Sequence, residues 1–364
     1  MRRLVLSNEG PALFSSELRR VLLIRLRSIG DTALMTPCLV ALRNWKADLE
    51  VDVVVERIAA PILEAHPLIT KLYVLERSLY SRYEVIGKLR ARRYDIAFNL
   101  HGGTTATFLA FLSGAKHTVC YRANQYSFLL DHRAPSPERI WGKNEIHCVE
   151  QQVGLLKWVG LDLERPPAGL LKPWSEAVVK VRQLLDARKI GRYVLVHPAA
   201  AFESKRWPAE HFAELLEHIY DNYGLIGVAA IAPSEVGIGR RLVTLAKTPV
   251  ELFTDLSLAE LLALIDEAVL VIGNDSGPAH MAAILGKPLL MVFGSSNVRV
   301  WRPWSVAPYR VVSAELPCSP CPGKICREYV SPQCILHPSL LWKAIKAVDE
   351  LFAEVRIDRK SCEC

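Results

Sequence analysis

Strand-length apolar runs alternate with helix-patterned segments, and this alternation runs through the chain twice. In the first half the apolar runs cover residues 21–26, 51–55, 71–75 and 94–100. In the second half they cover residues 193–198, 226–231, 269–273 and 288–293. Apolar strands separated by helices are typical of a parallel sheet that is covered on both faces. The sequence therefore predicts an α/β protein with two Rossmann-like halves.

The chain of 364 residues fits two domains better than one, because a single core stops growing in chains of this length. Residues 163–174 contain three prolines and no periodicity, so we expect the linker there. We predict domains over residues 1–172 and 173–338. Residues 339–364 carry apolar residues at helical spacing and predict a C-terminal helix that could pack back on the N-terminal domain.

The composition is that of a globular protein, with 51% hydrophobic and 23% charged residues. The formal net charge of +7 favours anionic partners, although a solvated basic surface is equally consistent with it. No apolar run approaches the roughly 20 residues that span a bilayer. The apolar stretch after Met1-Arg2-Arg3 ends at Ser7, too early for a signal peptide. We therefore expect a cytoplasmic protein without a membrane-spanning helix.

Three polar loops follow predicted strands, at the sheet edge where open α/β proteins bind ligands. The first loop, residues 27–32, holds Asp31 on a glycine-bearing turn. The next helix is predicted to begin with Thr36 as its cap and Pro37 at its first position. Asp31 could take a proton from an attacking hydroxyl group. The alternative is an aspartate that only caps the next helix.

The second loop, residues 198–208, places Ser204, Lys205 and Arg206 just ahead of a helix that ends at Gly224. Cations at this position could neutralise the charge that grows on a departing diphosphate. A solvated basic loop is the alternative.

The third loop, residues 273–280, enters a short helix. Ser276 and Gly277 offer backbone amides at the helix start, which can hold a phosphate. We expect Asp275 to bind sugar hydroxyls, since a carboxylate beside phosphates would repel them. His280 could donate to a phosphate, or it could be a structural histidine.

Two common nucleotide-binding classes are disfavoured by missing motifs. Neither half has a Gly-x-Gly-x-x-Gly segment after its first strand, and the chain has no Gly-x-x-x-x-Gly-Lys-Ser/Thr segment. Both patterns supply the glycine-rich turns that let the backbone approach phosphates closely. Their absence counts against a nicotinamide-dependent dehydrogenase and a P-loop NTPase.

The three loops, taken together and in order, resemble the motif set of glycosyltransferase family 9, the ADP-heptose:lipopolysaccharide heptosyltransferases. The motifs are Arg27-x-x-Gly30-Asp31 with Thr36-Pro37, then Lys205-Arg206-Trp207-Pro208, then Asp275-Ser276-Gly277-Pro278-x-His280 with Gly294 after the next strand. The resemblance covers roughly residues 20–350. It implies a GT-B fold, with an acceptor-side N-terminal domain and a nucleotide-sugar-binding C-terminal domain facing a central cleft.

The same resemblance implies an inverting enzyme that needs no metal or other cofactor and moves heptose from ADP-heptose to a lipopolysaccharide core or related glycolipid. By motif position, Asp31 would be the general base and Lys205 would hold the diphosphate. The donor-binding residues would be Ser204, Glu235, Asp275, Ser276, Gly277 and His280. The acceptor side or its loop would be supported by Arg27, Ser28 and Gly30.

Two features depart from the family or match it thinly. Relatives often carry Ser or Thr in the loop before the lysine, where this chain has residues 199–201, all alanine, and Ser204 could compensate. Glu235 matches a ribose-binding carboxylate only by its place after a strand. The implied partners are a nucleotide-sugar donor, a glycolipid acceptor and, by peripheral contact, the inner face of the cytoplasmic membrane, but not nucleic acid.

Nine cysteines in a chain of this length do not suggest a secreted disulfide framework. Three occur singly and are predicted to be buried thiols: Cys38, Cys120 and Cys148. Four others cluster: Cys318, Cys321, Cys326 and Cys334. Four thiolates in one loop could surround a tetrahedral zinc ion, or they could be ordinary reduced or oxidised thiols. The cluster also leaves open a second function, a non-catalytic nucleotide-sugar-binding protein with a docking or metal loop.

Overall fold

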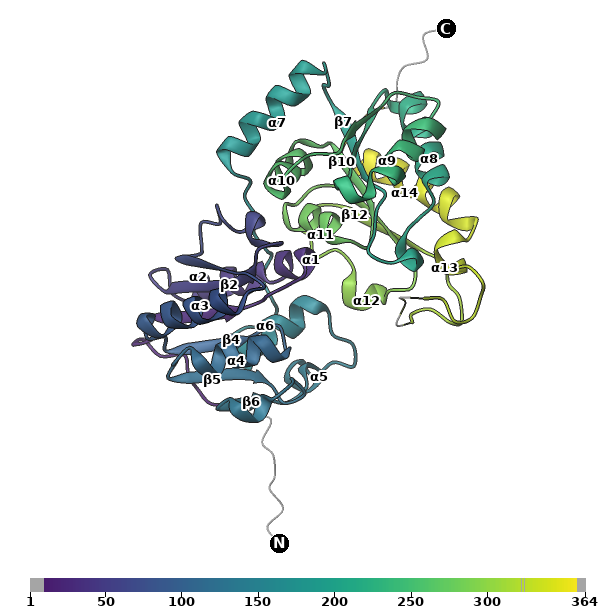
Figure 1. The fold of residues 1–364 in the computed structure, drawn as a ribbon. Helices are drawn as coiled ribbons and strands as arrows, with labels where there is room; N and C mark the ends of the chain where they lie inside the picture. The colour runs from purple at the N-terminus through teal and green to yellow at the C-terminus, as the bar shows by residue number, and fades with distance from the viewer. Residues whose placement is uncertain (1–9, 322, 324, 359–364) are drawn as a thin grey trace. The chain divides into compact units, whose positions relative to one another are not determined.

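The chain forms two compact units, Met1–Lys172 and Pro173–Cys364 (Figure 1). The computed structural model describes residues 10–321, 323 and 325–358. Each unit contains one six-stranded sheet in which every neighbouring pair of strands is parallel. Residues 1–9, on which the expectation about a signal peptide rests, lie outside the described residues.

The first sheet has the strand order β3-β2-β1-β4-β5-β6, so that the order reverses between β1 and β4. Its strands are β1 (Arg20–Ile24), β2 (Glu50–Glu56), β3 (Lys71–Leu75), β4 (Ile96–Asn99), β5 (His117–Tyr121) and β6 (His132–Ala134). The helices of this unit are α1 (Ile29–Ala33), α2 (Thr36–Trp45), η1 (Ala60–Ile62), α3 (Leu79–Arg92), α4 (Thr104–Leu112), η2 (Ser127–Leu129), α5 (Pro137–Trp141) and α6 (Cys148–Trp158). Helix α2 packs with α6, and α3 with α4. Right-handed crossovers place these two pairs on opposite faces of the sheet.

The second sheet has the order β12-β11-β10-β7-β8-β9 and reverses between β7 and β10. Its strands are β7 (Tyr193–His197), β8 (Ile226–Ala230), β9 (Val250–Phe253), β10 (Leu270–Asn274), β11 (Leu289–Phe293) and β12 (Tyr309–Ser313). Its helices are α7 (Ser175–Ala187), η3 (Glu203–Lys205), α8 (Ala209–Tyr223), η4 (Pro233–Glu235), α9 (Val236–Leu245), α10 (Leu258–Glu267), α11 (Gly277–Ile284), α12 (Val298–Trp301), α13 (Gln333–Leu336) and α14 (Ser339–Glu354). Both sheets therefore have the Rossmann strand order, and each places its ligand edge at the point of reversal.

All eight predicted apolar runs contain a strand, whereas β5, β6, β9 and β12 were not predicted. The reason lies in their position and composition. Strands β6, β9 and β12 are edge strands, and β6 has only three residues. Strand β5 reads His-Thr-Val-Cys-Tyr, so polar side chains interrupt its apolar pattern. Strands that are short or half-exposed lack the continuous apolar run that marks a central parallel strand.

The segment after β1 differs from the prediction in two respects. Asp31 lies within the short helix α1, not in an open loop. The predicted cap of α2 was wrong, because Thr36 is the first helical residue and Met35 is the cap. Only Leu34 and Met35 separate α1 from α2, and Met35 already has helical backbone angles, so no extended capping residue is needed. The Thr36 hydroxyl instead donates to the Ala33 carbonyl at 2.8 Å.

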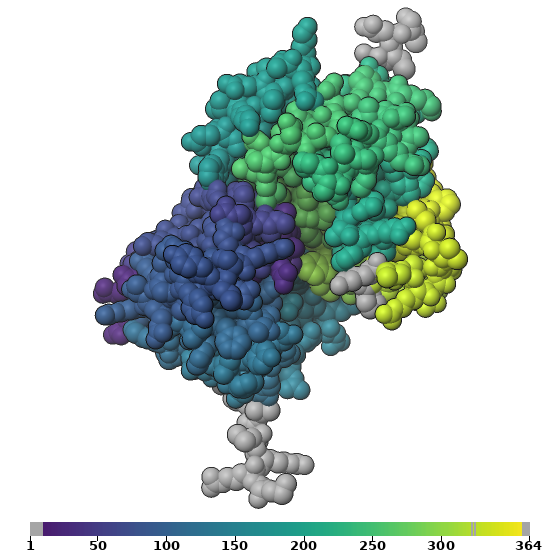
Figure 2. All heavy atoms as spheres, in the orientation of Figure 1, coloured from purple at the N-terminus to yellow at the C-terminus, as the bar shows by residue number. Residues whose placement is uncertain are grey.

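Helix α14 packs within the second unit, against β11, β12 and α8. Figures 1 and 2 show this yellow C-terminal segment lying on the green and teal chain of that unit. Its buried face is apolar and includes Leu340, Ala344, Val348, Leu351 and Phe352. Its packing on the N-terminal domain stays a prediction. Among the residues that the structure describes, we find no helix with the length and apolar character needed to cross a membrane.

Candidate active site

In the first unit, Asp31 lies at the point where the strand order reverses, directly beyond β1. Its carboxylate oxygen Oδ2 accepts hydrogen bonds from the Ser28 backbone amide at 3.2 Å and from the Ser28 hydroxyl at 3.0 Å. Ser28 is the N-cap of α1, and Asp31 is the third residue of that helix. A carboxylate in the first helical turn is also stabilised by the helix dipole. The structural capping role and a location at the ligand edge therefore coexist in this residue.

Arg25, which was not predicted as a site residue, forms an ion pair with Oδ1 of Asp31. The Arg25 guanidinium also donates to the Leu100 carbonyl at 2.8 Å, so it joins the ends of β1 and β4. Both charged side chains are mostly buried, with 12% of Arg25 and 19% of Asp31 exposed. This pair fixes the orientation of the carboxylate. A cation inside the apolar run Val-Leu-Leu-Ile-Arg-Leu was the available sequence signal.

Two further groups surround Asp31. The Cys148 thiol lies 3.9 Å from Oδ1 of Asp31, and burial together with the Asp31 charge raises the pKa of this thiol to about 12. Cys148 is therefore protonated and acts as a weak donor. Burial, together with the charges of Arg25 and Arg27, lowers the pKa of His101 to about 4. His101, also missed from sequence, is a neutral imidazole near pH 7.

The other predicted residues of this loop differ in burial. Gly30 is buried within α1, and its carbonyl accepts from the Leu34 amide at 2.9 Å. The Arg27 side chain is 65% exposed and lies 3.9 Å from Glu56. Gly30 therefore supports the loop, whereas the Arg27 side chain remains accessible to a ligand.

In the second unit, the structure brings together Lys205, Asp275 and His280 from two loops at its point of reversal. Lys205 Nζ donates to Oδ2 of Asp275 at 2.7 Å, and His280 Nε2 lies 3.2 Å from Oδ1 of the same carboxylate. Burial alone would raise the pKa of Asp275, but His280 and Lys205 hold it well below its usual range. Asp275 is therefore an anion that orients two cationic or donor groups.

These contacts change the role expected for Asp275. Both of its oxygens are engaged by protein groups, and its side chain is only 4% exposed, so it is poorly placed to bind sugar hydroxyls directly. The Lys205 side chain is 23% exposed and donates one of its three ammonium protons to Asp275. The remaining protons are available for an anion.

Unpaired polar atoms lie beside this group. Within the described part of the chain, the Ser276 hydroxyl and Nδ1 of His280 are buried without a hydrogen-bond partner. The Ser296 hydroxyl, in the loop after β11, is in the same state. Ser276 is the N-cap of α11, whose first residue is Gly277, so the first backbone amides of this helix have no partner within the helix. Buried donors without partners at a helix start indicate a site for a polar, anionic ligand.

The contacts of Ser204 and Glu235 differ from those of that group. The buried Ser204 hydroxyl contacts Ser295 Oγ at 2.9 Å and donates to the Gly323 carbonyl, so its capacity is used inside the protein. Gly294 is required here, because a Cβ atom at this position would lie 1.9 Å from the Ser204 carbonyl oxygen. Glu235 ends η4 after β8, and the hydrogen bonds and ion pairs given above for Lys205, Asp275 and His280 do not involve it.

Asn274 is a positioning residue that sequence reasoning passed over. Its Oδ1 accepts from the Trp207 amide at 3.0 Å, and its Nδ2 donates to the Pro198 carbonyl at 2.9 Å. The buried amide side chain thereby ties both ends of the loop that carries Lys205 to the end of β10. An asparagine directly before the Asp-Ser-Gly segment was the available sequence signal.

The cysteines divide as expected in burial, since the three single cysteines are buried. Burial, together with nearby Cys321, Cys326 and Cys318, raises the pKa of the Cys334 thiol to about 11. Among the residues that the structure describes, no three His, Cys, Asp or Glu side chains are grouped so that they could hold a metal ion. The zinc hypothesis for this cluster gains no support and stays a prediction.

Solved structures with the same fold come from sugar transferases. The chain aligns over 94% of its length with 99% of the crystal structure of the glycosyl transferase family 9 protein from Veillonella parvula, with a TM-score of 0.82 and 22% identity. It aligns over 93% of its length with 99% of E. coli ADP-heptose lps heptosyltransferase II, with a TM-score of 0.76 and 19% identity. The two Rossmann-like units therefore form a GT-B protein, as expected from sequence.

Sequence relatives agree with these structures. Lipopolysaccharide heptosyltransferase 3 of Escherichia coli is 28% identical over 303 residues, which cover 77% of this chain and 85% of the relative. Lipopolysaccharide heptosyltransferase 1 of Campylobacter coli is 24% identical over 297 residues, or 76% of this chain and 84% of the relative. Residues 82–330 match the model of glycosyltransferase family 9 (heptosyltransferase). Since this match spans more than half of the chain, the protein is an enzyme that belongs to glycosyltransferase family 9.

Proposed function

We propose that this enzyme transfers heptose from ADP-heptose to a lipopolysaccharide core or related glycolipid, with inversion at the anomeric carbon and without a catalytic metal. The observation that carries the proposal is the Lys205–Asp275–His280 group beside the unpaired donors at the start of α11. It has the character of a diphosphate site. The names of the relatives supply the sugar, the nucleotide and the acceptor.

In this proposal the second unit, residues 173–338, binds the donor. Lys205 and the amides of Ser276 and Gly277 hold the diphosphate, and the Ser276 hydroxyl donates to a phosphate oxygen, as Nδ1 of His280 does when the imidazole is doubly protonated. Asp275 acts through Lys205 and His280, which it orients. These groups stabilise the charge that develops on the diphosphate as the glycosidic bond breaks.

The first unit, residues 1–172, binds the acceptor, and Asp31 serves as the general base. The acceptor oxygen attacks the anomeric carbon on the face opposite the diphosphate, and the electron pair of the breaking bond leaves with ADP. Asp31 takes the hydroxyl proton. Because the hydroxyl becomes acidic only as the new bond forms, the proton moves late, after bond formation has begun. One displacement inverts the anomeric centre.

A glycolipid acceptor requires contact with a membrane surface. We place the enzyme at the inner face of the cytoplasmic membrane, as a peripheral protein. The net charge of +7 supports this placement, because the cytoplasmic leaflet carries anionic lipids. Nucleic acid is not among the proposed partners.

The test of the mechanism is the variant Asp31→Asn. This change keeps the size of the side chain but removes the base, so transfer should fall by about 10²–10⁴. The measurement is ADP release from ADP-heptose in the presence of acceptor, with donor binding followed by thermal shift. Donor binding should be unchanged, because the donor is held by the second unit in this proposal.

The exposed Asp48 provides a matched control, and Asp48→Asn should retain wild-type transfer. Normal turnover by Asp31→Asn would refute the base assignment. The same thermal-shift assay compares ADP with UDP, since a ligand stabilises the fold in proportion to its affinity. A clear preference for UDP would refute the heptose donor.

A further inference from the structure

Four exposed aromatic side chains gather on one surface of the first unit. Phe108 and Phe111 on α4 are 41% and 49% exposed, and Tyr126 and Phe128 at η2 are 49% and 68% exposed. The ring centroids of Phe108 and Tyr126 are 5.9 Å apart, and those of Tyr126 and Phe128 are 6.2 Å apart. Helix α4 and η2 are in contact. We call Phe108, Phe111, Tyr126 and Phe128 the aromatic patch.

Helix α4 departs from the pattern of an ordinary surface helix. Its sequence, Thr-Thr-Ala-Thr-Phe-Leu-Ala-Phe-Leu, contains no charged residue. The face that meets the protein core is already supplied by Ala106, Leu109 and Ala110. A surface helix normally directs polar or charged side chains away from its core face. Here that outer face carries phenylalanines, so α4 is apolar toward the core and also apolar away from it.

Cations surround the aromatic patch and carboxylates are missing from its sequence. No Asp or Glu occurs between Asp95 and Asp131, the interval that contains α4 and η2. Arg122, four residues before Tyr126, is exposed, and Arg90 of α3 lies against Gly114 just past the end of α4. An apolar patch with arginines beside it and no carboxylate in its own segment complements a surface that is apolar below and anionic above.

From these observations we infer that the aromatic patch docks the enzyme on an anionic lipid bilayer. The rings enter the headgroup region, where aromatic residues are favoured, and Arg90 and Arg122 pair with lipid phosphates. A second copy of the chain is a poorer occupant, because two patches face to face would bring Arg90 and Arg122 of one copy against the same arginines of the other. Like charges at an interface repel. Four side chains also fall short of the 20–30 residues a side that a stable protein interface typically uses.

The patch is connected to the candidate active site within the same unit. The side-chain oxygen of Gln125, next to Tyr126, accepts from the Thr104 hydroxyl at 2.7 Å. The backbone amide of Gln125 donates to the Gly102 carbonyl at 3.1 Å. Gly102 follows His101 in the loop beyond β4, beside Asp31. Docking through the patch therefore holds this loop near the bilayer surface, where a glycolipid presents its sugars. This step of the inference rests on the proposed acceptor, whereas bilayer binding does not.

The experiment is flotation of the full chain with vesicles of phosphatidylethanolamine and phosphatidylglycerol. The variant Phe108→Ser, Phe111→Ser, Phe128→Ser should lower the vesicle partition coefficient by about tenfold or more, given the apolar area it removes. Its unfolding transition should stay cooperative and its midpoint should fall only modestly, because the three side chains are partly exposed. The matched control replaces three similarly exposed apolar residues of the second unit, Val179, Val306 and Trp342, with serine, and should bind vesicles as wild type does.

Three results would overturn the inference. They are absence of wild-type binding to these vesicles, unchanged binding by the patch variant, and a wild-type dimer in sedimentation that the patch variant abolishes. The failure of the proposed function is separable, since Asp31→Asn should lose transfer but keep vesicle binding. The patch variant should in turn keep transfer to a water-soluble acceptor fragment.

Discussion

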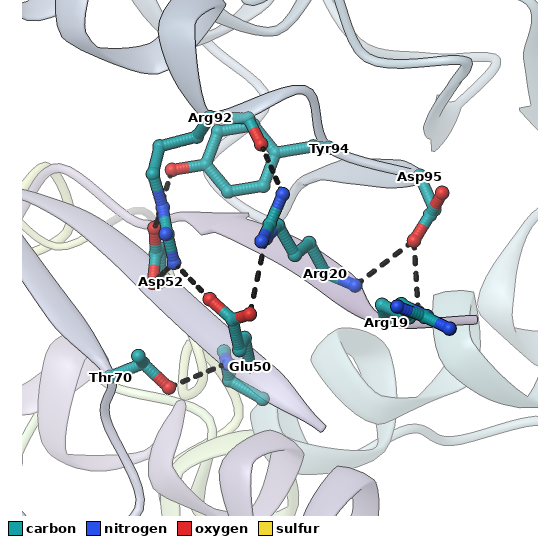
Figure 3. A network of polar contacts seen from close by, with 9 residues as sticks. Arg19, Arg20, Glu50, Asp52, Thr70, Arg92, Tyr94 and Asp95 are labelled. Atoms are coloured by element: carbon teal, nitrogen blue, oxygen red, sulfur yellow. Dashed lines mark hydrogen bonds and ion pairs between the residues drawn. The ribbon is translucent and has the colours of Figure 1, made fainter. Parts of the chain in front are cut away.

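Two buried aspartates, Asp52 in the first unit and Asp275 in the second, hold cations in different ways. Asp52 lies on β2 and accepts from Arg92 Nε at 2.9 Å and from the Tyr94 hydroxyl at 2.7 Å (Figure 3). Asp275 follows β10 and holds Lys205 and His280 at 2.7 Å and 3.2 Å. Both side chains are nearly inaccessible, with 0% and 4% exposed. Burial and charge alone would not distinguish them.

The difference lies in what each group leaves unpaired. Around Asp52, Arg92 also donates to Glu50 at 2.5 Å, Glu50 accepts from Arg20 at 3.2 Å, and Arg20 donates to the Arg92 carbonyl at 3.2 Å, so the network closes on itself (Figure 3). Around Asp275, Lys205 is partly exposed, and within the described residues Nδ1 of His280 has no partner. A closed network of charges stabilises a fold, and an open one at a ligand edge indicates function.

The prediction with the largest expected effect tests the network around Asp52. Asp52→Ala leaves Arg92 with Glu50 as its remaining carboxylate and the Tyr94 hydroxyl without its acceptor. Removing one partner of a buried ion pair costs up to about 3–5 kcal/mol, so the free energy of unfolding should fall by an amount approaching that value. Urea unfolding measures this change. The transfer rate of the folded fraction should stay at the wild-type level.

Glu84→Ala provides the control, because Glu84 pairs with Lys88 on the exposed face of α3. Its unfolding midpoint should match that of the wild type, since exposed ion pairs contribute little. A loss of activity in folded Asp52→Ala, beyond about threefold, would show that the network also serves catalysis, and the contrast with Asp275 would fail.

The second prediction tests the Lys205–Asp275–His280 group. Lys205→Ala removes the ammonium proposed to face the diphosphate, and kcat should fall by about 10²–10³, the usual cost of losing one charge-stabilising donor. Steady-state ADP release measures it. The change in stability should be smaller than for Asp52→Ala, because Asp275 keeps its contact with His280 and the space left by Lys205 opens to solvent. A variant that unfolds easily but transfers normally would reverse the assignment of the two aspartates.

Much of the fold could be predicted from sequence because central parallel strands carry continuous apolar runs. The runs at residues 21–26 and 269–273 therefore revealed β1 and β10. Edge strands such as β6 and β12 bury fewer side chains and lack this signal. The cap of α2 was mistaken because the preceding helix α1 has only five residues, too few for a periodic pattern.

The candidate site was predictable only in part. Lys205, Asp275 and His280 stood in recognisable loops, and the order of strands explains why those loops meet. Arg25 and Asn274 were passed over because each ends or follows an apolar strand, and their roles depend on partners distant in sequence. Ser204 illustrates the reverse, since its hydroxyl is engaged by Ser295, 91 residues away. Long-range pairing of this kind leaves no local pattern.

The smallest expected effect is the pH dependence of the stability that ionised Asp275 contributes. Lys205 and His280 hold the pKa of Asp275 below its ordinary value of 3.8, so the unfolded chain takes up this proton first as pH falls. The stability that ionised Asp275 contributes is therefore complete above that value and is lost below it. Between about pH 5 and pH 3, the unfolding free energy of the wild type relative to Asp275→Asn should fall by about 1 kcal/mol.

Urea unfolding of both proteins across this range measures that difference, and other carboxylates cancel because the two chains share them. A difference that stays flat with pH would mean that Lys205 and His280 do not hold the Asp275 carboxylate ionised. Lys205 would then lack the fixed partner that orients it toward a diphosphate. The role proposed for the Lys205–Asp275–His280 group would have to be revised.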